Sequence, residues 1–230
     1  MNQQLALAIQ LNNDSTLADF CWRNNPLLQE QLFATLKGQG ERIVYLWGVP
    51  GCGKTHLLQA CCQQTDSAHS AIYLPLAILH EWGPDMLDGI ANHTLICIDN
   101  IDLIAENPAW EEAIFHLYNR IRDNDQALLI IAGNQTPMNL GIALPDLRSR
   151  LSWGLVMQVN ELRDEDKIYS LKLHAHNRGF ELASSVAQFL LNRCGRNMHE
   201  LHALLNSLDE ASLRAQRKIT IPFVKEILSI

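Results

Sequence analysis

The eight residues from Gly48 to Thr55 constrain the fold of this chain more than any other stretch. They read Gly-Val-Pro-Gly-Cys-Gly-Lys-Thr and satisfy the pattern Gly-x-x-x-x-Gly-Lys-Ser/Thr. Glycines let the backbone curl until successive N–H groups point at phosphate oxygens. The apolar run at 43–47 predicts a strand before the loop, and residues 57–60 predict a helix after it. Strand, loop and helix in this order are typical of an α/β fold that binds phosphate groups.

The side chains and backbone of this loop supply the predicted nucleotide-binding groups. Lys54 carries a charge that reaches the β- and γ-phosphates, and the Thr55 hydroxyl is a ligand for Mg²⁺. The helix that follows adds the positive potential of its N-terminal end, and its histidine is expected to take no part in binding. Because Cys52 lies just before that helix, a reactive thiol there is a further hypothesis. The expected nucleotide-binding residues of the loop are Gly48, Gly51, Cys52, Gly53, Lys54 and Thr55.

Composition narrows the class of protein. A chain of 230 residues with 47% hydrophobic residues has room for one large domain or a large and a small one. Its net charge of −7 is opposite in sign to that of most nucleic-acid-binding domains. The cysteines form no Cys-x-x-Cys pair, which argues against a zinc ribbon or a redox dithiol. Without a basic leader or an 18-residue apolar run, we expect a cytoplasmic protein with no membrane partner.

Apolar strands alternate with helices over the first two thirds of the chain. This alternation predicts a parallel sheet covered by helices on both faces. From about residue 162 only helical periodicity remains, which predicts a small all-helical domain. We expect an extended leader at 1–13, a nucleotide-binding domain at 14–160 and a helical domain at 161–230. The expected strands are 43–47, 71–75, 95–99, 127–132 and 156–159, and the expected helices are 27–36, 55–64, 108–123, 164–177, 184–194, 197–214 and 220–228.

Two strand ends carry polar residues suited to phosphate chemistry. Asp99 ends the apolar strand 95–99 and is the expected second Mg²⁺ group beside Thr55. The next residue is Asn100 rather than an acid that polarises the attacking water, which favours slow hydrolysis or none. Asp102 is an alternative acid, although it is displaced by two residues. Asn134 follows the strand 127–132 and is expected either to orient water or contact the γ-phosphate, or to be an ordinary turn residue.

Two further groups of side chains are candidates for sites. Arg150 lies in a basic element after Pro145, and an arginine can stabilise a phosphoryl-transfer transition state in a neighbouring subunit. The alternative is an arginine in a surface ion pair. His199 and His202 are three residues apart, but no carboxylate motif accompanies them, so no metal site is expected there.

Together these features resemble the AAA+ module of the DnaA initiator family over about residues 14–230. The resemblance implies that Arg150 is an arginine finger acting in trans, that Asn134 is sensor 1 and that the C-terminal helices form a lid. At the sensor 2 position the family has an arginine where this chain has His199, so ADP is expected to bind as well as ATP. The residues at 17–20 and Asn25 are the implied adenine pocket. The supporting stretches are 97–101, 113–120, 144–154 and 215–228.

The chain resembles, more narrowly, the short regulatory members of that family, which have no DNA-binding domain after the lid. In those members a leader segment binds the sliding clamp (beta) of DNA polymerase III. A glutamine followed by alternating aliphatic residues suits an apolar groove, and a frayed tail is the alternative. The residues implied in clamp binding are Gln4, Leu5, Leu7 and Ile9.

The resemblance therefore implies a regulator with ADP or ATP and Mg²⁺ that docks on the clamp and stimulates hydrolysis of DnaA-bound ATP. The chain is expected not to be an enzyme in its own right, apart from a weak intrinsic ATPase activity. Association with further copies of the chain stays open. The alternatives are a self-sufficient AAA+ ATPase such as a helicase loader, and an adaptor that acts through DnaA without inactivating it.

Overall fold

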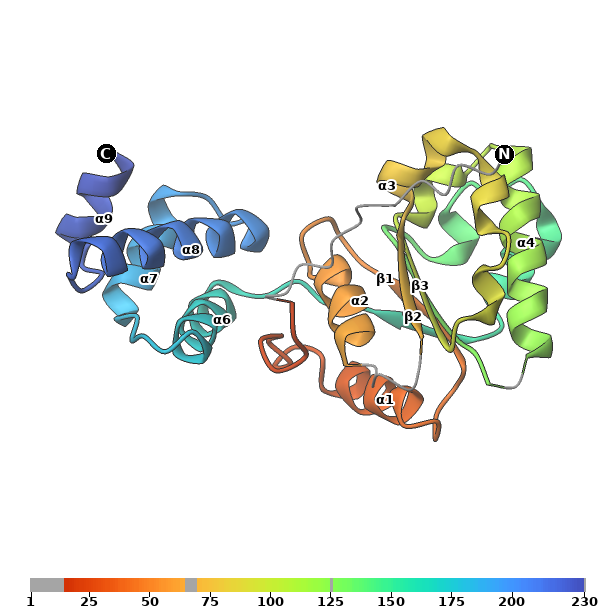
Figure 1. Ribbon diagram of the computed structural model, residues 1–230, viewed down its shortest axis with the longest axis horizontal. Helices are drawn as coiled ribbons and strands as arrows, with labels where there is room; N and C mark the ends of the chain where they lie inside the picture. Colours follow the sequence, from red (N-terminus) through yellow and green to blue (C-terminus); the bar gives the residue numbers. More distant parts are fainter. Residues whose placement is uncertain (1–14, 65–69, 125, 230) are drawn as a thin grey trace. The chain divides into compact units, whose positions relative to one another are not determined.

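The computed structural model describes residues 15–64, 70–124 and 126–229 (Figure 1). The predicted leader and its clamp-binding residues Gln4, Leu5, Leu7 and Ile9 lie outside this part of the chain. The chain forms two compact units. The first contains Leu27–Val49 and Lys54–Val159, and the second contains Ala18–Pro26, Pro50–Gly53 and the chain from Asn160 onward.

The second unit therefore includes a segment that the predicted domain range 14–160 placed with the sheet. Side-chain hydrogen bonds explain why Ala18–Pro26 belongs to it. Asn160 N donates to Asn25 Oδ1 at 2.8 Å, and Asn177 Nδ2 donates to Asp19 Oδ1 at 2.5 Å. Contacts between residues more than a hundred positions apart leave no periodic signal in a sequence.

The first unit contains a five-stranded parallel sheet in the order β2-β3-β4-β1-β5. Strand β4 pairs with β1 on one side and with β3 on the other, so that Trp47 lies opposite Gly133. The carboxyl ends of β1, β3 and β4 consequently meet at one edge of the sheet. The strands are β1 (Ile43–Trp47), β2 (Ala71–Pro75), β3 (Leu95–Asp99), β4 (Leu128–Gly133) and β5 (Leu155–Gln158).

Helices cover both faces of this sheet (Figure 1). Helix α2 contacts β2, β3 and β4, and α4 packs its apolar side on the opposite face. The Asn107 side chain caps α4, and Pro108 occupies its first turn. The α-helices of this unit are α1 (Pro26–Leu36), α2 (Lys54–Gln63), α3 (Leu76–Leu79), α4 (Pro108–Asp123) and α5 (Pro145–Leu151). The short 3-10 helices are η1 (His80–Trp82), η2 (Pro84–Leu87), η3 (Ile90–Asn92), η4 (Ile101–Ile104) and η5 (Pro137–Asn139).

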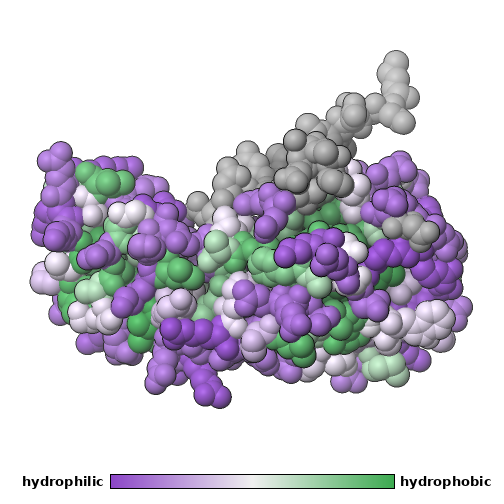
Figure 2. Space-filling view, turned by 90° about the horizontal axis from the view of Figure 1, so that it is seen from below, coloured by the Kyte–Doolittle hydropathy of each residue, from purple (hydrophilic) through white to green (hydrophobic). Residues whose placement is uncertain are grey.

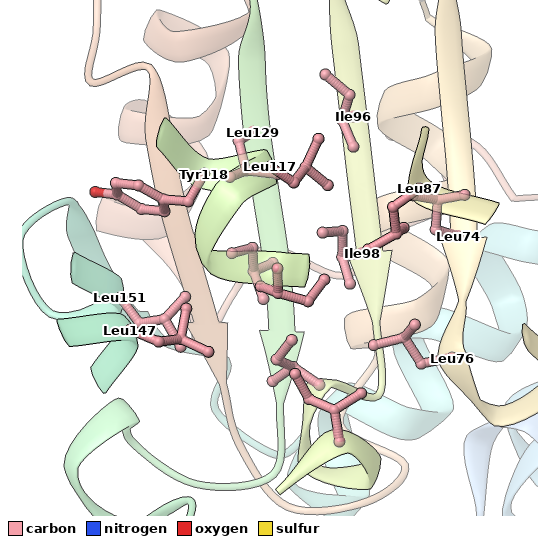
Figure 3. Packing of buried hydrophobic residues seen from close by; sticks show 14 of the residues in the cluster. Leu74, Leu76, Leu87, Ile96, Ile98, Leu117, Tyr118, Leu129, Leu147 and Leu151 are labelled. Atoms are coloured by element: carbon pink, nitrogen blue, oxygen red, sulfur yellow. The ribbon is translucent and has the colours of Figure 1, made fainter. Parts of the chain in front are cut away.

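Alternate residues of the central strands build the core under α4 and α5. Ile96 and Ile98 of β3 point to the same face, where Leu117 of α4 meets them (Figure 3). Leu147 and Leu151 of α5 complete this core beside β1 (Figure 3). The helix that carries Arg150 is thus packed on the sheet by its apolar residues.

The second unit is helical and has its own apolar core, which includes Leu190, Leu205 and Phe223. Its helices are α6 (Asp164–Asn177), α7 (Ser184–Arg193), α8 (Met198–Ala215) and α9 (Ile221–Leu228). A polar layer crosses between α6 and α8. The buried His174 ring stacks on His202 with centroids 4.6 Å apart, and Arg178 pairs with Asp209 at 3.2 Å.

The predicted fold class is confirmed: a parallel sheet flanked by helices is followed by a small all-α unit. Some predicted strands are displaced by one residue, since 127–132 is observed as Leu128–Gly133 and 156–159 as Leu155–Gln158. The short α3 and α5 were not predicted as helices, because one or two turns are too short to show helical periodicity. No helix in the described ranges combines the length and apolar character needed to cross a membrane. Hydrophilic residues cover much of the face drawn in Figure 2, with smaller hydrophobic areas among them.

Candidate nucleotide-binding site

The phosphate-binding loop joins β1 to α2. Lys54 is the first residue of α2 and is 7% exposed, and its Nζ donates to the carbonyl oxygens of Gly48 at 2.7 Å and Val49 at 3.1 Å. The ammonium group is therefore folded back over the loop that precedes it. A lysine held in this way presents its charge to any anion that the loop binds.

Two glycines are required by the backbone of this loop. Gly51 has a φ of 83° and Gly53 a φ of 104°, both in the left-handed region. A Cβ on Gly53 would also lie 2.8 Å from Cε2 of Phe20. Cys52, between them, is 4% exposed, which leaves reagents little access to its thiol and argues against the hypothesis of a reactive cysteine.

Helix α2 carries a histidine in its first turn, directly after Thr55. This histidine is His56, and position 57 holds Leu57. Leu57 is fully buried, as its place in the apolar pattern of α2 requires. The Nε2 atom of His56 lies 2.8 Å from the carbonyl oxygen of Thr16. That this histidine takes no part in nucleotide binding stays a prediction.

The predicted Mg²⁺ residues lie next to each other. Asp99 is 1% exposed, and its Oδ2 accepts hydrogen bonds from the Thr55 hydroxyl at 2.6 Å and the Tyr73 hydroxyl at 2.9 Å. The backbone N–H of Asn100 donates to the other oxygen at 2.9 Å. Burial, and then the charge of Asp99, raise the pKa of Tyr73, so the phenol stays protonated and donates to the carboxylate. Tyr73 was missed from the sequence, because it lies in the apolar strand β2 and no motif marks it as part of this site.

Asn100 has left-handed backbone angles, φ 59° and ψ 43°, and begins the 3-10 helix η4. Asparagine tolerates this conformation better than most residues. Asp102, two residues on, accepts the backbone N–H of Asn134 at 2.7 Å and 3.0 Å to its two oxygens. The structure therefore brings Asn134 and Asp102 together at the carboxyl edge of the sheet. There Asp102 accepts a backbone hydrogen bond, which is a different role from that of the water-polarising acid absent at position 100.

Arg150 lies on α5 among aromatic rings. Its guanidinium carbon is 4.8 Å from the ring centroid of Phe115, 6.0 Å from that of Tyr118 and 5.9 Å from that of Trp153. Its Nη1 is buried with no hydrogen-bond partner among the described residues. Trp153 is itself 69% exposed. Within the described ranges no carboxylate pairs with Arg150, which disfavours the alternative of an arginine in a surface ion pair.

The remaining predicted residues belong to the helical unit. The side chain of His199 is outside what the structure describes, so its place at the sensor 2 position stays a prediction. Arg196 forms an ion pair with Asp164 at 3.4 Å.

Both polar ends of the buried Asn25 amide form hydrogen bonds with the backbone of Asn160. That Asn25 contributes to an adenine pocket stays a prediction. His202 stacks on His174, and the described part of the chain contains no group of three His, Cys, Asp or Glu residues placed to hold a metal ion. The absence of a metal site at His199 and His202 stays a prediction.

The protein-family model for the bacterial DnaA ATPase domain matches residues 29–158 of this chain. The family model for the Hda lid domain matches residues 164–228. The chain therefore belongs to the bacterial DnaA ATPase-domain family, which is a branch of the AAA+ proteins. Its helical unit is similar to the lid domain of Hda.

Solved structures show the same fold. Domain III of the Thermotoga maritima replication initiation protein DnaA superposes with a TM-score of 0.79 at 19% identity, covering 96% of this chain and 98% of that one. AMPPCP-bound DnaA from Aquifex aeolicus gives a TM-score of 0.72 at 22% identity, covering 86% of this chain and 66% of that one. The RuvB Holliday junction branch migration motor of Thermotoga maritima gives 0.67 at 18% identity, covering 96% and 73%.

Proposed function

We propose that this chain is a nucleotide-binding AAA+ regulator of replication initiation, which stimulates hydrolysis of the ATP bound to DnaA. The observation that carries the proposal is the combination of a complete phosphate loop with an arginine that has no carboxylate partner among the described residues. Such a chain is equipped to hold its own nucleotide and to act on that of a neighbour.

The nucleotide is ADP or ATP, held by the backbone N–H groups of the loop and by Lys54. The left-handed glycines and the folded-back ammonium group support this assignment. Thr55 and Asp99 would hold Mg²⁺, which neutralises phosphate charge when bound. The Aquifex aeolicus DnaA structure with AMPPCP is that of a relative with the same fold.

The chain itself hydrolyses ATP slowly in this proposal. Asn100 stands where a second acid would polarise water, and Asp102 has both carboxylate oxygens bonded to the backbone of Asn134. The stimulated hydrolysis takes place on DnaA, whose site receives Arg150. Because no acid neutralises the guanidinium within the described part of the chain, its charge is available to a transition state in the partner.

Removing the loop lysine tests the nucleotide site. Lys54→Ala is expected to weaken ADP binding roughly 10- to 150-fold, since one charge-assisted hydrogen bond contributes about 1.5–3 kcal/mol. Isothermal calorimetry with Mg²⁺ measures the change, and Lys37→Ala, at an exposed lysine after α1, is the matched control. Wild-type protein that gives no heat of association with ADP or ATP would contradict the proposed site.

A reconstituted hydrolysis assay tests the regulatory function. We expect the protein to accelerate hydrolysis of DnaA-bound ATP when the sliding clamp is loaded on DNA, and we expect deletion of residues 1–10 to abolish the clamp-dependent part. The predicted clamp-binding residues Gln4, Leu5, Leu7 and Ile9 motivate the deletion. Unchanged DnaA-bound ATP would exclude the function, and Lys54-dependent ATPase activity of the chain alone, well above background, would favour the self-sufficient ATPase.

A further inference from the structure

The turn after β4 is held from two neighbouring elements. Gly133 ends the strand, and a Cβ there would overlap the hydroxyl of Tyr45 and lie 2.9 Å from Cγ2 of Ile101. The Tyr45 hydroxyl donates to the carbonyl oxygen of Gln135 at 2.9 Å. Burial, and then the charge of Asp102, raise the pKa of Tyr45, so the phenol remains a donor. The backbone on either side of Asn134 is therefore fixed by contacts from β1 and η4.

Asp102 completes this arrangement from η4. Its two carboxylate oxygens lie 2.7 Å and 3.0 Å from the backbone nitrogen of Asn134. The single N–H of Asn134 is therefore shared between both oxygens of a charged group. Hydrogen bonds to charged groups are roughly twice as strong as neutral ones. The left-handed turn at Asn100 carries the chain from the end of β3 into η4 and so delivers Asp102 to the end of the adjacent strand β4.

This geometry separates two roles for Asp102. An acid that polarises an attacking water needs a carboxylate oxygen directed at that water. Here both oxygens accept from the chain's own backbone, at the residue that follows Gly133 on the sheet's carboxyl edge. The exposed side chain of Asn134 projects from a backbone that Asp102 restrains.

We propose that Asp102 is a positioning residue that sets the direction of the Asn134 side chain toward the terminal phosphate of the bound nucleotide. The inference rests on the proposed nucleotide binding and deepens it. Asp102 then acts only through Asn134, and it contributes to the discrimination between ATP and ADP rather than to affinity for the diphosphate.

A double-mutant cycle tests this role. The variants are Asp102→Asn, Asn134→Ala and the two combined, and calorimetry with Mg²⁺ measures the dissociation constants for ATP and for ADP. Asp102→Asn is expected to weaken ATP binding roughly 3- to 10-fold, a loss that corresponds to one hydrogen bond of ordinary strength. ADP binding is expected to stay within about twofold of the wild-type value. In the Asn134→Ala background the same substitution is expected to have no further effect.

The control is Asp123→Asn at the end of α4, where an exposed carboxylate pairs with Arg122. It is expected to change neither constant. An Asp102→Asn effect of the same size with and without Asn134 would overturn the inference, as would a fall in melting temperature with an unchanged ratio of the ATP and ADP constants. Wild-type protein that binds neither nucleotide would overturn the proposed function first, and the inference with it, before any variant is compared.

Discussion

Replacing Arg150 with alanine is expected to lower the stimulated hydrolysis of DnaA-bound ATP by about a thousandfold or more. An arginine supplied in trans stabilises charge on the transferring phosphoryl group, and such residues contribute about 10³- to 10⁵-fold to the rate constant. Single-turnover release of phosphate from DnaA loaded with labelled ATP measures the effect. Arg150→Lys is expected to restore little, because an ammonium group lacks the planar fork of a guanidinium.

Two observations separate this loss from general damage. Arg148 lies on the same short helix and is only partly buried, so Arg148→Ala is the matched control, expected to retain stimulation within about threefold. The stacking of Arg150 on Phe115, Tyr118 and Trp153 contributes on the order of 1 kcal/mol to stability, so the variant is expected to fold and to bind its own nucleotide normally. Full stimulation by folded Arg150→Ala protein would exclude the arginine finger.

Glu111→Ala is expected to lower the free energy of unfolding by about 3 kcal/mol, because it leaves three backbone N–H groups without their acceptor. Glu111 lies on α4 and is 1% exposed. Its Oε1 accepts from Glu106 N at 2.9 Å and Ala143 N at 3.0 Å, and its Oε2 accepts from Leu144 N at 2.7 Å. Leu144 is the N-cap residue directly before α5, so this carboxylate anchors the start of the helix that carries Arg150.

Urea denaturation of the whole chain measures this loss. Glu111→Gln keeps one acceptor oxygen but turns an NH₂ group toward the donors, so its stability is expected between those of wild type and alanine variant. Glu112→Ala is the matched control, since that side chain is 72% exposed and pairs only weakly with His116 at 3.6 Å; a change within about 0.5 kcal/mol is expected. An equally small change in Glu111→Ala would show that water replaces the carboxylate at no cost.

Local features of the sequence are sufficient for the elements and for part of the site. The observed bounds match the predicted ones for the strands Ile43–Trp47 and Leu95–Asp99 and for the helix Pro108–Asp123. The loop glycines and Lys54 are recognisable because their chemistry depends on spacing within eight residues. The one-residue displacements at β4 and β5 lie at strand ends, where bounds are least sharp: Val159 N still donates to the carbonyl oxygen of Trp47 at 2.7 Å, although β5 ends at Gln158.

The tertiary structure decided which residues far apart in the chain become neighbours. The sequence by itself determined an α/β fold with a phosphate loop, an acid at the end of β3 and a helical C-terminal unit. Only the packed sheet, with β4 between β1 and β3, brings Asp102 to Asn134, Tyr73 to Asp99 and Glu111 to the start of α5. The physical reason is that patterns of 2.0 and 3.6 residues report which face of an element is buried, whereas a hydrogen bond across some thirty residues depends on which strands and helices become neighbours.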